Sequence, residues 1–146
     1  MPKSGHEREK IRAVIDTSVF VAAIFWRGSA RDVLTRFARR EFEACVSENI
    51  LREYAETAWT LKIEEDLPQN PQPWLNWMST RATILAPVPL NEPVCVDSDD
   101  DKFIECALAA RAECIVSRDR HLLQLEKPFG ISILEDRAFL AVLKGG

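Results

Sequence analysis

The sequence has few of the residues from which zinc sites, phosphate-binding loops and membrane spans are built. Its 146 residues include four cysteines and two histidines, and no two cysteines form a C-x-x-C pair, so we do not expect a zinc site. Only five glycines are present, and none lies in a glycine-rich loop that would grip phosphate. No apolar run reaches membrane-spanning length. Reduced thiols and the lack of an export signal favour a cytoplasmic protein.

The charge balance also limits the classes of function. A net charge of −4 at pH 7 argues against a protein that coats nucleic acid by charge alone, although an enzyme with an acidic site remains possible. The composition is 47% hydrophobic and 29% charged, which is typical of a soluble globular protein. We expect a flexible tail over residues 1–10, which are polar, and a single domain over residues 11–146.

Short apolar runs alternate with helical patterns along the chain. This alternation predicts an α/β fold, in which a parallel sheet is covered by helices on both faces. Thr17 or Ser18 is expected to cap the first helix. The predicted strands are residues 11–16, 42–46, 83–88, 113–117 and 130–134, and the predicted helices are 17–25, 29–42, 47–63, 74–82, 100–111, 118–125 and 135–143.

Acidic residues lie where such a sheet binds its ligands. Asp16 closes the first predicted strand and Asp119 follows the fourth, and open α/β sheets bind ligands outside the carboxyl ends of their strands. Asp101 lies in the first turn of a helix whose loop should face the same edge. Glu53 lies in the second turn of the helix after strand two, on the flank of its apolar face. Glu48 lies on the other flank, so helical spacing alone does not single out Glu53.

Carboxylates gathered at one edge need a positive partner. Two of them roughly 4 Å apart repel by about 4 kcal/mol at an effective dielectric near 20. Hard oxygen ligands suit Mg²⁺ or Mn²⁺. A metal ion bound there can activate water and stabilise the charge of a phosphodiester that is being cut.

Three segments resemble the PIN-domain family of metal-dependent ribonucleases. They are "VIDTSVFVAA", "VSENILREYAET" and "DSDDDKFIECALAARAECIVSRDRHLL", and the closing "GISILEDRAFL" is similar to the last strand and helix of the family. The third segment is the longest and most specific. The resemblance runs from about Ile11 to Leu140, and the most similar subgroup is that of the VapC-like toxins of bacterial toxin–antitoxin systems. Ser18 departs from the asparagine that many members carry there.

The resemblance implies both a fold and a function. It implies a three-layer, Rossmann-like sheet, Mg²⁺ or Mn²⁺ as cofactor, and endoribonuclease activity on RNA. An antitoxin protein would be the partner that covers the acidic pocket, and a homo-oligomer is expected. The residues carried over are Asp16, Glu53, Asp101 and Asp119 as catalytic and metal-binding acids, Asp99 as a further metal ligand, and Thr17 and Ser117 as hydroxyls beside the metal.

Other interpretations of the same residues stay open. Asp99, Asp100 and Asp101 all suit the positive end of a helix dipole. A binding or regulatory module that keeps the fold without cleaving RNA is the main alternative function, and a metal-dependent phosphatase for a small molecule is a third. Trp59, Trp74 and Trp77 surround a linker that could form a substrate or dimer surface, although packing is the more common role of tryptophan.

Overall fold

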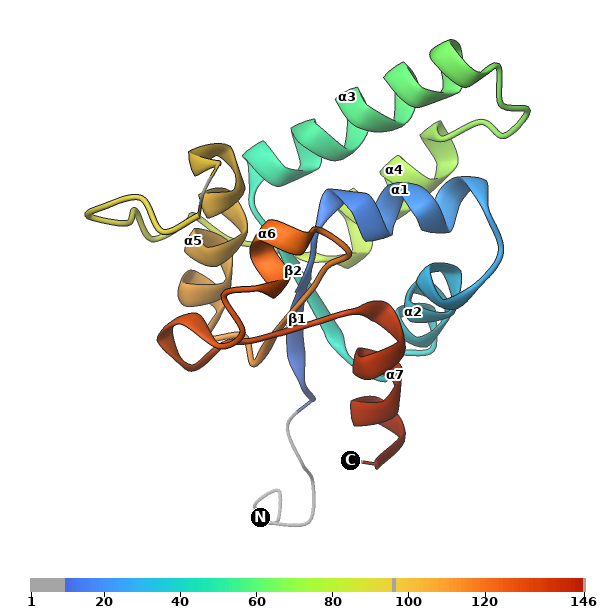
Figure 1. Ribbon diagram of the computed structural model, residues 1–146. Coiled ribbons are helices and arrows are strands. Elements are labelled where there is room, and N and C mark those ends of the chain that lie inside the picture. The colour runs from blue at the N-terminus through green and yellow to red at the C-terminus, as the bar shows by residue number, and fades with distance from the viewer. Residues whose placement is uncertain (1–9, 96, 146) are drawn as a thin grey trace.

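The computed structural model describes residues 10–95 and 97–145, so the expected flexible tail lies outside the described residues except for Lys10. The described part contains five strands, seven α-helices and two short 3₁₀ helices (Figure 1). In chain order they are β1 (Arg12–Ile15), α1 (Thr17–Phe25), α2 (Ser29–Ala38), β2 (Glu43–Val46), α3 (Glu48–Glu65), α4 (Gln72–Arg81), β3 (Thr83–Ile84), η1 (Ser98–Asp100), α5 (Asp101–Ala110), β4 (Cys114–Val116), α6 (Arg120–Leu123), η2 (Pro128–Gly130), β5 (Ser132–Leu134) and α7 (Asp136–Gly145).

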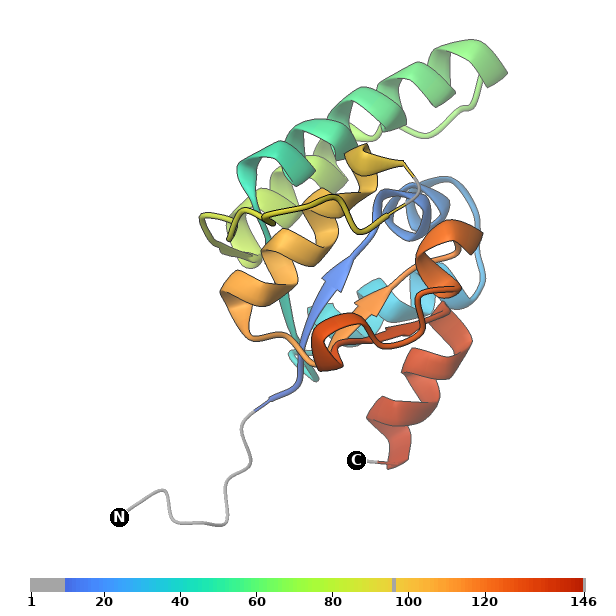
Figure 2. The same ribbon diagram turned by 60° about the vertical axis from the view of Figure 1, so that its left-hand side comes forward.

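The strands form one parallel sheet in the order β3-β2-β1-β4-β5. Central strand β1 pairs through Ala13 with both Ala44 of β2 and Cys114 of β4. Helix α5 packs on β1, β2 and β4, whereas α7 packs on β4, β5 and α2. Figure 2 shows α5 and α7 on opposite sides of the strands. The predicted α/β fold, a parallel sheet flanked by helices, is therefore confirmed.

Helix α1 is buried almost all round and fixes the region above β1. Eight of its nine residues are buried, as its nearly all-apolar sequence requires. It packs against α2 and α3. Phe20 of α1 stacks on Tyr54 of α3 with ring centroids 4.2 Å apart, and the Tyr54 hydroxyl donates to the carbonyl oxygen of Ile15. These contacts hold the second turn of α3 over the carboxyl end of β1.

Three local predictions were wrong in detail. The third strand covers only Thr83–Ile84, because Pro87 and Pro89 lack the N–H that would extend pairing along this edge. Helix α2 stops at Ala38, before the chain turns through the left-handed Arg40 (φ 62°). Helix α1 is capped by Asp16, whose side chain accepts from the Ser18 amide.

The buried apolar side chains belong to one hydrophobic cluster. The four cysteines are buried and free, as expected for cysteines that act as small apolar residues. Between residues 10 and 145, leaving out residue 96, no helix combines the length and the apolar character that crossing a membrane requires.

Candidate functional site

The acidic residues lie near the point of the sheet at which the strand order reverses, between β1 and β4. The chain adds β2 and β3 on one side of β1 and then β4 and β5 on the other, so a crevice is expected between the carboxyl ends of β1 and β4. Asp16 follows β1 and Asp119 lies shortly after β4. The amide of Asp16 donates to the carbonyl of Val116 at 2.9 Å, which keeps the two strand ends in register. Figure 1 shows α1 and α6 beginning at this edge.

Asp16 is buried and well supplied with donors. Its side chain is almost inaccessible, because the residue is 3% exposed. Its Oδ1 accepts from the Ser18 amide at 2.5 Å and from the Ser18 hydroxyl at 2.6 Å, and its Oδ2 accepts from the Ser117 hydroxyl. Burial raises the pKa of Asp16, these hydrogen bonds oppose the rise, and the charge of Asp119 adds to it. The residue has the perturbed pKa that is common in functional sites.

Ser117 connects the two strand-end acids. This fully buried residue donates to Asp16 and accepts the amide of Asp119 at 2.9 Å. The Asp119 carboxylate in turn accepts from the His121 amide at 2.9 Å and caps α6. The hydroxyl expected beside the metal therefore lies between the acids, where it fixes their relative position.

A third acid, Asp100, lies with this pair. The pKa of Asp100 is raised to about 7 by burial, by the charge of Asp119 and a hydrogen bond with it, and by the charges of Asp97 and Asp16. Sequence reasoning assigned Asp100 no more than a favourable position at a helix N-terminus. Its neighbours now identify Asp100 as the member of the acidic run that accompanies Asp16 and Asp119.

Asp101 lies in the first turn of α5, as expected, and its carboxylate is bonded to the loop that precedes the helix. It is buried, 7% exposed, and its carboxylate accepts from the amides of Val94 and Cys95 at 3.1 and 2.7 Å. These bonds anchor the loop that leads into α5. The signal for an acid of this helix was the run 99–101, and a 3₁₀ turn, Ser98–Asp100, precedes Asp101 in the structure.

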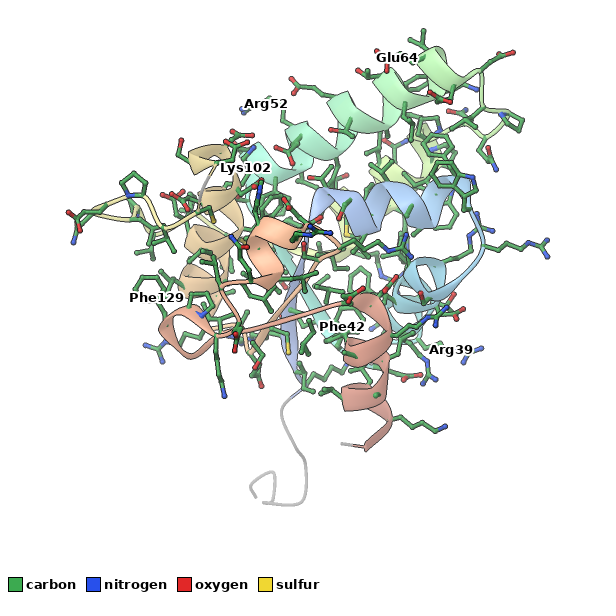
Figure 3. The ribbon with its side chains drawn as sticks, in the orientation of Figure 1. Arg39, Phe42, Arg52, Glu64, Lys102 and Phe129 are labelled. Atoms are coloured by element: carbon green, nitrogen blue, oxygen red, sulfur yellow. The ribbon has the colours of Figure 1, made fainter. Side chains whose placement is uncertain are left out.

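Glu53 and Asp99 share one cation, which sequence reasoning missed. The Glu53 carboxylate accepts from the Thr17 hydroxyl through Oε2 and from the Lys102 ammonium through Oε1. Lys102 Nζ also lies 3.2 Å from Asp99 Oδ2. Burial lowers the pKa of Lys102, but the hydrogen bonds and charges of Glu53 and Asp99 outweigh it, so that the pKa is raised. Figure 3 shows Lys102 between the starts of α3 and α5.

Lys102 divides the site into two halves. On one side the Lys102 ammonium, whose side chain is only 13% exposed, forms ion pairs with both Glu53 and Asp99. On the other side burial, together with the charges of neighbouring acids, raises the pKa values of Asp16 and Asp100. A lysine within an acidic run was the available signal, but its partner Glu53 lies 49 positions away.

The donors on the side of Asp16 and Asp100 fit a divalent cation in kind. Carboxylate oxygens are the ligands that Mg²⁺ and Mn²⁺ prefer, and a cation would offset the charges that, together with burial, raise the pKa of Asp100. Among the residues that the structure describes, no three acids, histidines or cysteines are already arranged as a metal cage. Side chains of this group would therefore have to reorient in order to surround an ion.

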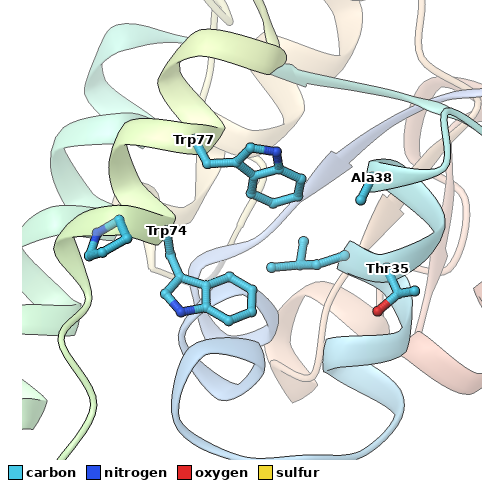
Figure 4. Close-up of a pocket in the computed structure, with 6 residues that line it drawn as sticks. Thr35, Ala38, Trp74 and Trp77 are labelled. Carbon is cyan, nitrogen blue, oxygen red and sulfur yellow. The ribbon is translucent and has the colours of Figure 1, made fainter.

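The tryptophans of the linker region lie elsewhere. Trp74 and Trp77 of α4 line a shallow pocket of about 280 Å³ against Thr35 and Ala38 of α2 (Figure 4). The guanidinium of Arg31 lies 5.5 Å from the centre of the Trp74 ring. None of the site acids lines this pocket, so Trp74 and Trp77 serve helix packing and a surface separate from the acidic crevice.

Comparisons with known proteins agree with this geometry. The family model described as "PIN domain" matches residues 12–121, which include all the acids of the crevice. The crystal structure of PAE2754 from Pyrobaculum aerophilum is similar in fold, with a TM-score of 0.64 and 18% sequence identity over 93% of this chain and 91% of that chain. No curated protein sequence matches the chain. Because the family match covers well over half of its 146 residues, the chain belongs to the PIN domain family.

Proposed function

We propose that this protein is a metal-dependent endoribonuclease, with Asp16, Asp100 and Asp119 as the acids that hold Mg²⁺ or Mn²⁺. PIN domains are generally nucleases, and such nucleases generally use divalent metals. The observation that carries the proposal is the meeting of acids from three separate segments at the switch point, where burial first, and then the charges of neighbouring acids, raise the pKa of Asp100 to about 7. Burying like charges together is energetically unfavourable, and a bound cation would compensate the repulsion between these carboxylates.

The residues of the chain divide the work of phosphodiester hydrolysis. A bound divalent ion would activate water and stabilise charge on the phosphate and leaving oxygens. Ser117 and Ser18 would keep the Asp16 carboxylate oriented toward the ion. Arg120 and His121 directly follow Asp119 and are exposed, so they are positioned to contact the phosphates of a bound strand.

RNA cleavage with and without metal tests this function. The purified protein is incubated with single-stranded and structured RNAs and with DNA of the same sequence, in Mg²⁺, in Mn²⁺ and in chelator. Asp119→Asn removes a proposed ligand while nearly keeping its shape, and Asp32→Asn in α2 removes an exposed carboxylate as the matched control. We expect RNA to be cut by the wild type and by Asp32→Asn in metal alone, and not by Asp119→Asn.

Two outcomes would reject the proposal. Cleavage that persists in chelator or in Asp119→Asn would contradict the metal mechanism. Metal binding without cleavage of any nucleic acid would favour the alternative function, a binding or regulatory module. That alternative agrees with the lack of a ready-made metal cage among the described residues.

We also propose that the nuclease acts as the toxin of a toxin–antitoxin pair, on the strength of the sequence resemblance. Controlled production in a bacterial host should then arrest growth, and Asp119→Asn should abolish the arrest. Normal growth of cells that contain active wild-type enzyme would reject the toxin role and leave the nuclease function untouched. An antitoxin that covers the acidic crevice would be expected to restore growth.

A further inference from the structure

The Lys102 ammonium contacts both Glu53 and Asp99, and only 13% of its side chain is exposed. The other Glu53 oxygen accepts from Thr17. Both oxygens of Glu53 are therefore engaged, one by a hydroxyl and one by a fixed positive charge.

The acids without such a partner form a separate group. Ser117 donates to Asp16 and accepts the amide of Asp119, whereas Glu53 contacts Thr17 and Lys102. Glu53 comes from α3 and Lys102 from α5, whereas Asp16 and Asp119 follow the central strands. A cation repels a like charge held at short range, so a divalent ion bound to Glu53 would first have to displace the Lys102 ammonium.

We propose that the Lys102 ammonium replaces a second metal ion, so that the chain binds one divalent cation, on the Asp16–Asp100–Asp119 side. This inference rests on the proposed metal-dependent function. Lys102 then acts as a positioning residue: it holds Glu53 and Asp99 at the edge of the crevice and supplies there a positive charge that does not depend on metal concentration. Glu53 is correspondingly a partner of Lys102 and not a metal ligand.

The number of bound ions tests this assignment without RNA. Mn²⁺ binding is measured by electron paramagnetic resonance of free Mn²⁺ and by titration calorimetry on the full chain. We expect one ion per wild-type chain and two per Lys102→Met chain, because methionine removes the charge and keeps the length of the side chain. Lys102→Arg should restore the single ion, and Lys144→Met, at an exposed lysine of α7, should also bind one.

A charge-balanced double variant checks the role of Glu53. Glu53→Gln with Lys102→Met removes both charges of the partly buried pair, and Asp99, which also loses its contact with Lys102, is exposed to solvent, so no buried charge is left unpaired. We expect this chain to bind a single ion with an affinity that differs from the wild type by less than about tenfold, the lower limit for the loss of a residue that supports a metal. It therefore remains informative even if Lys102→Met alone fails to fold.

Each contrary result has a distinct meaning. Two ions on the wild type, one ion on a folded Lys102→Met chain, or an affinity loss of about tenfold or more in the double variant would overturn the inference. No Mn²⁺ on the wild type would instead reject the proposed metal-dependent function, and the inference with it. A single ion on the wild type without RNA cleavage would reject the ribonuclease function and leave the role of Lys102 standing.

Discussion

The hydroxyl of Ser117 donates a hydrogen bond to the carboxylate of Asp16, across 101 positions of the sequence. The same hydroxyl accepts the amide of Asp119 at 2.9 Å. Because Ser117 follows β4 directly and Asp16 follows β1 directly, the pairing of the two central strands sets the spacing of the two acids. The core of the site is thus fixed by the pairing of β1 with β4.

Ser117→Ala should destabilise the protein through the site itself. The variant leaves the buried Asp16 carboxylate with one donor fewer and the Asp119 amide without this acceptor. We expect the free energy of unfolding to fall by about 1–3 kcal/mol, the usual cost of an unsatisfied buried group, as measured by urea denaturation. Ser79→Ala removes an exposed hydroxyl of α4 and should change it by no more than about 0.5 kcal/mol. Equal effects of the two variants would contradict this role for Ser117.

The metal-free protein should lose stability as the pH rises from about 4 to about 7. In this window the Asp100 carboxyl ionises in the unfolded chain, whose ordinary pKa is about 3.9, before it ionises in the folded protein, where its pKa is about 7. The unfolded state therefore releases its proton first, and deprotonation favours unfolding. The raised pKa of Asp16 acts in the same direction.

Asp100→Asn removes this penalty. In the presence of chelator we expect the variant to exceed the wild type in free energy of unfolding at pH 8 by on the order of 1 kcal/mol, a value reduced for solvent screening of a partly exposed group. The gain should vanish at pH 4, where the wild-type carboxyl is protonated. Urea denaturation across this pH range measures both, with Asp32→Asn as the control for loss of an exposed carboxylate. A gain that does not depend on pH would contradict the proposed cause.

Arg118→Met should destabilise the contact between α2 and α7, mostly above pH 4. Burial alone would raise the pKa of Asp136. The Arg118 guanidinium at 2.6 Å and the Ser29 hydroxyl at 2.9 Å lower it by more than burial raises it, so the pKa lies below its usual range. The contribution of Arg118 is therefore complete above the ordinary aspartate pKa of about 3.9 and is lost as the pH falls through the lowered value.

Urea denaturation of Arg118→Met at several pH values tests this contact. We expect a loss of about 1–3 kcal/mol at pH 7, because Asp136 is 3% exposed and cannot be solvated in place of its partner. The loss should shrink below pH 3. Arg137→Ala, at an exposed position of α7, serves as the control and should have little effect at either pH. A loss at pH 7 that persists undiminished at low pH would indicate lost packing and not lost charge.

The sheet and its two strand-end acids could be predicted because they depend on local patterns. The apolar runs before Asp16 and Asp119 are short, rich in branched residues and separated by helical segments, which is what a parallel sheet requires. Parallel strands place their carboxyl ends at one edge of the sheet. The acids that follow β1 and β4 therefore come together at this edge, independently of the path of the intervening loops.

The choice between Asp100 and Asp101 could not be made in this way. Helical periodicity is counted from the start of a helix, and α5 is preceded by the 3₁₀ turn Ser98–Asp100, in which residues are spaced differently. In addition, the loop amides of Val94 and Cys95 use the Asp101 carboxylate as their acceptor. Neither the 3₁₀ turn nor the path of the loop can be recognised from a periodic pattern in the sequence.

The pairing of Lys102 with Glu53 was beyond sequence reasoning for a different reason. It depends on how α3 and α5 lie relative to each other. Tyr54 of α3 is held by Phe20 of α1 and Ile15 of β1, and α5 packs separately on β1. Contacts between helices far apart in the chain arise from the summed packing of a core and not from any one segment.

The most direct test of the central claim is the position of the bound ion. Crystals grown with Mn²⁺ give an anomalous scattering peak at each manganese site. We predict a peak among the carboxylates of Asp16, Asp100 and Asp119, with Asp101 still bonded to the loop amides. A peak on Glu53 or Asp101, or none in the crevice at a Mn²⁺ concentration that supports RNA cleavage, would contradict the assignment of these three acids as the metal centre.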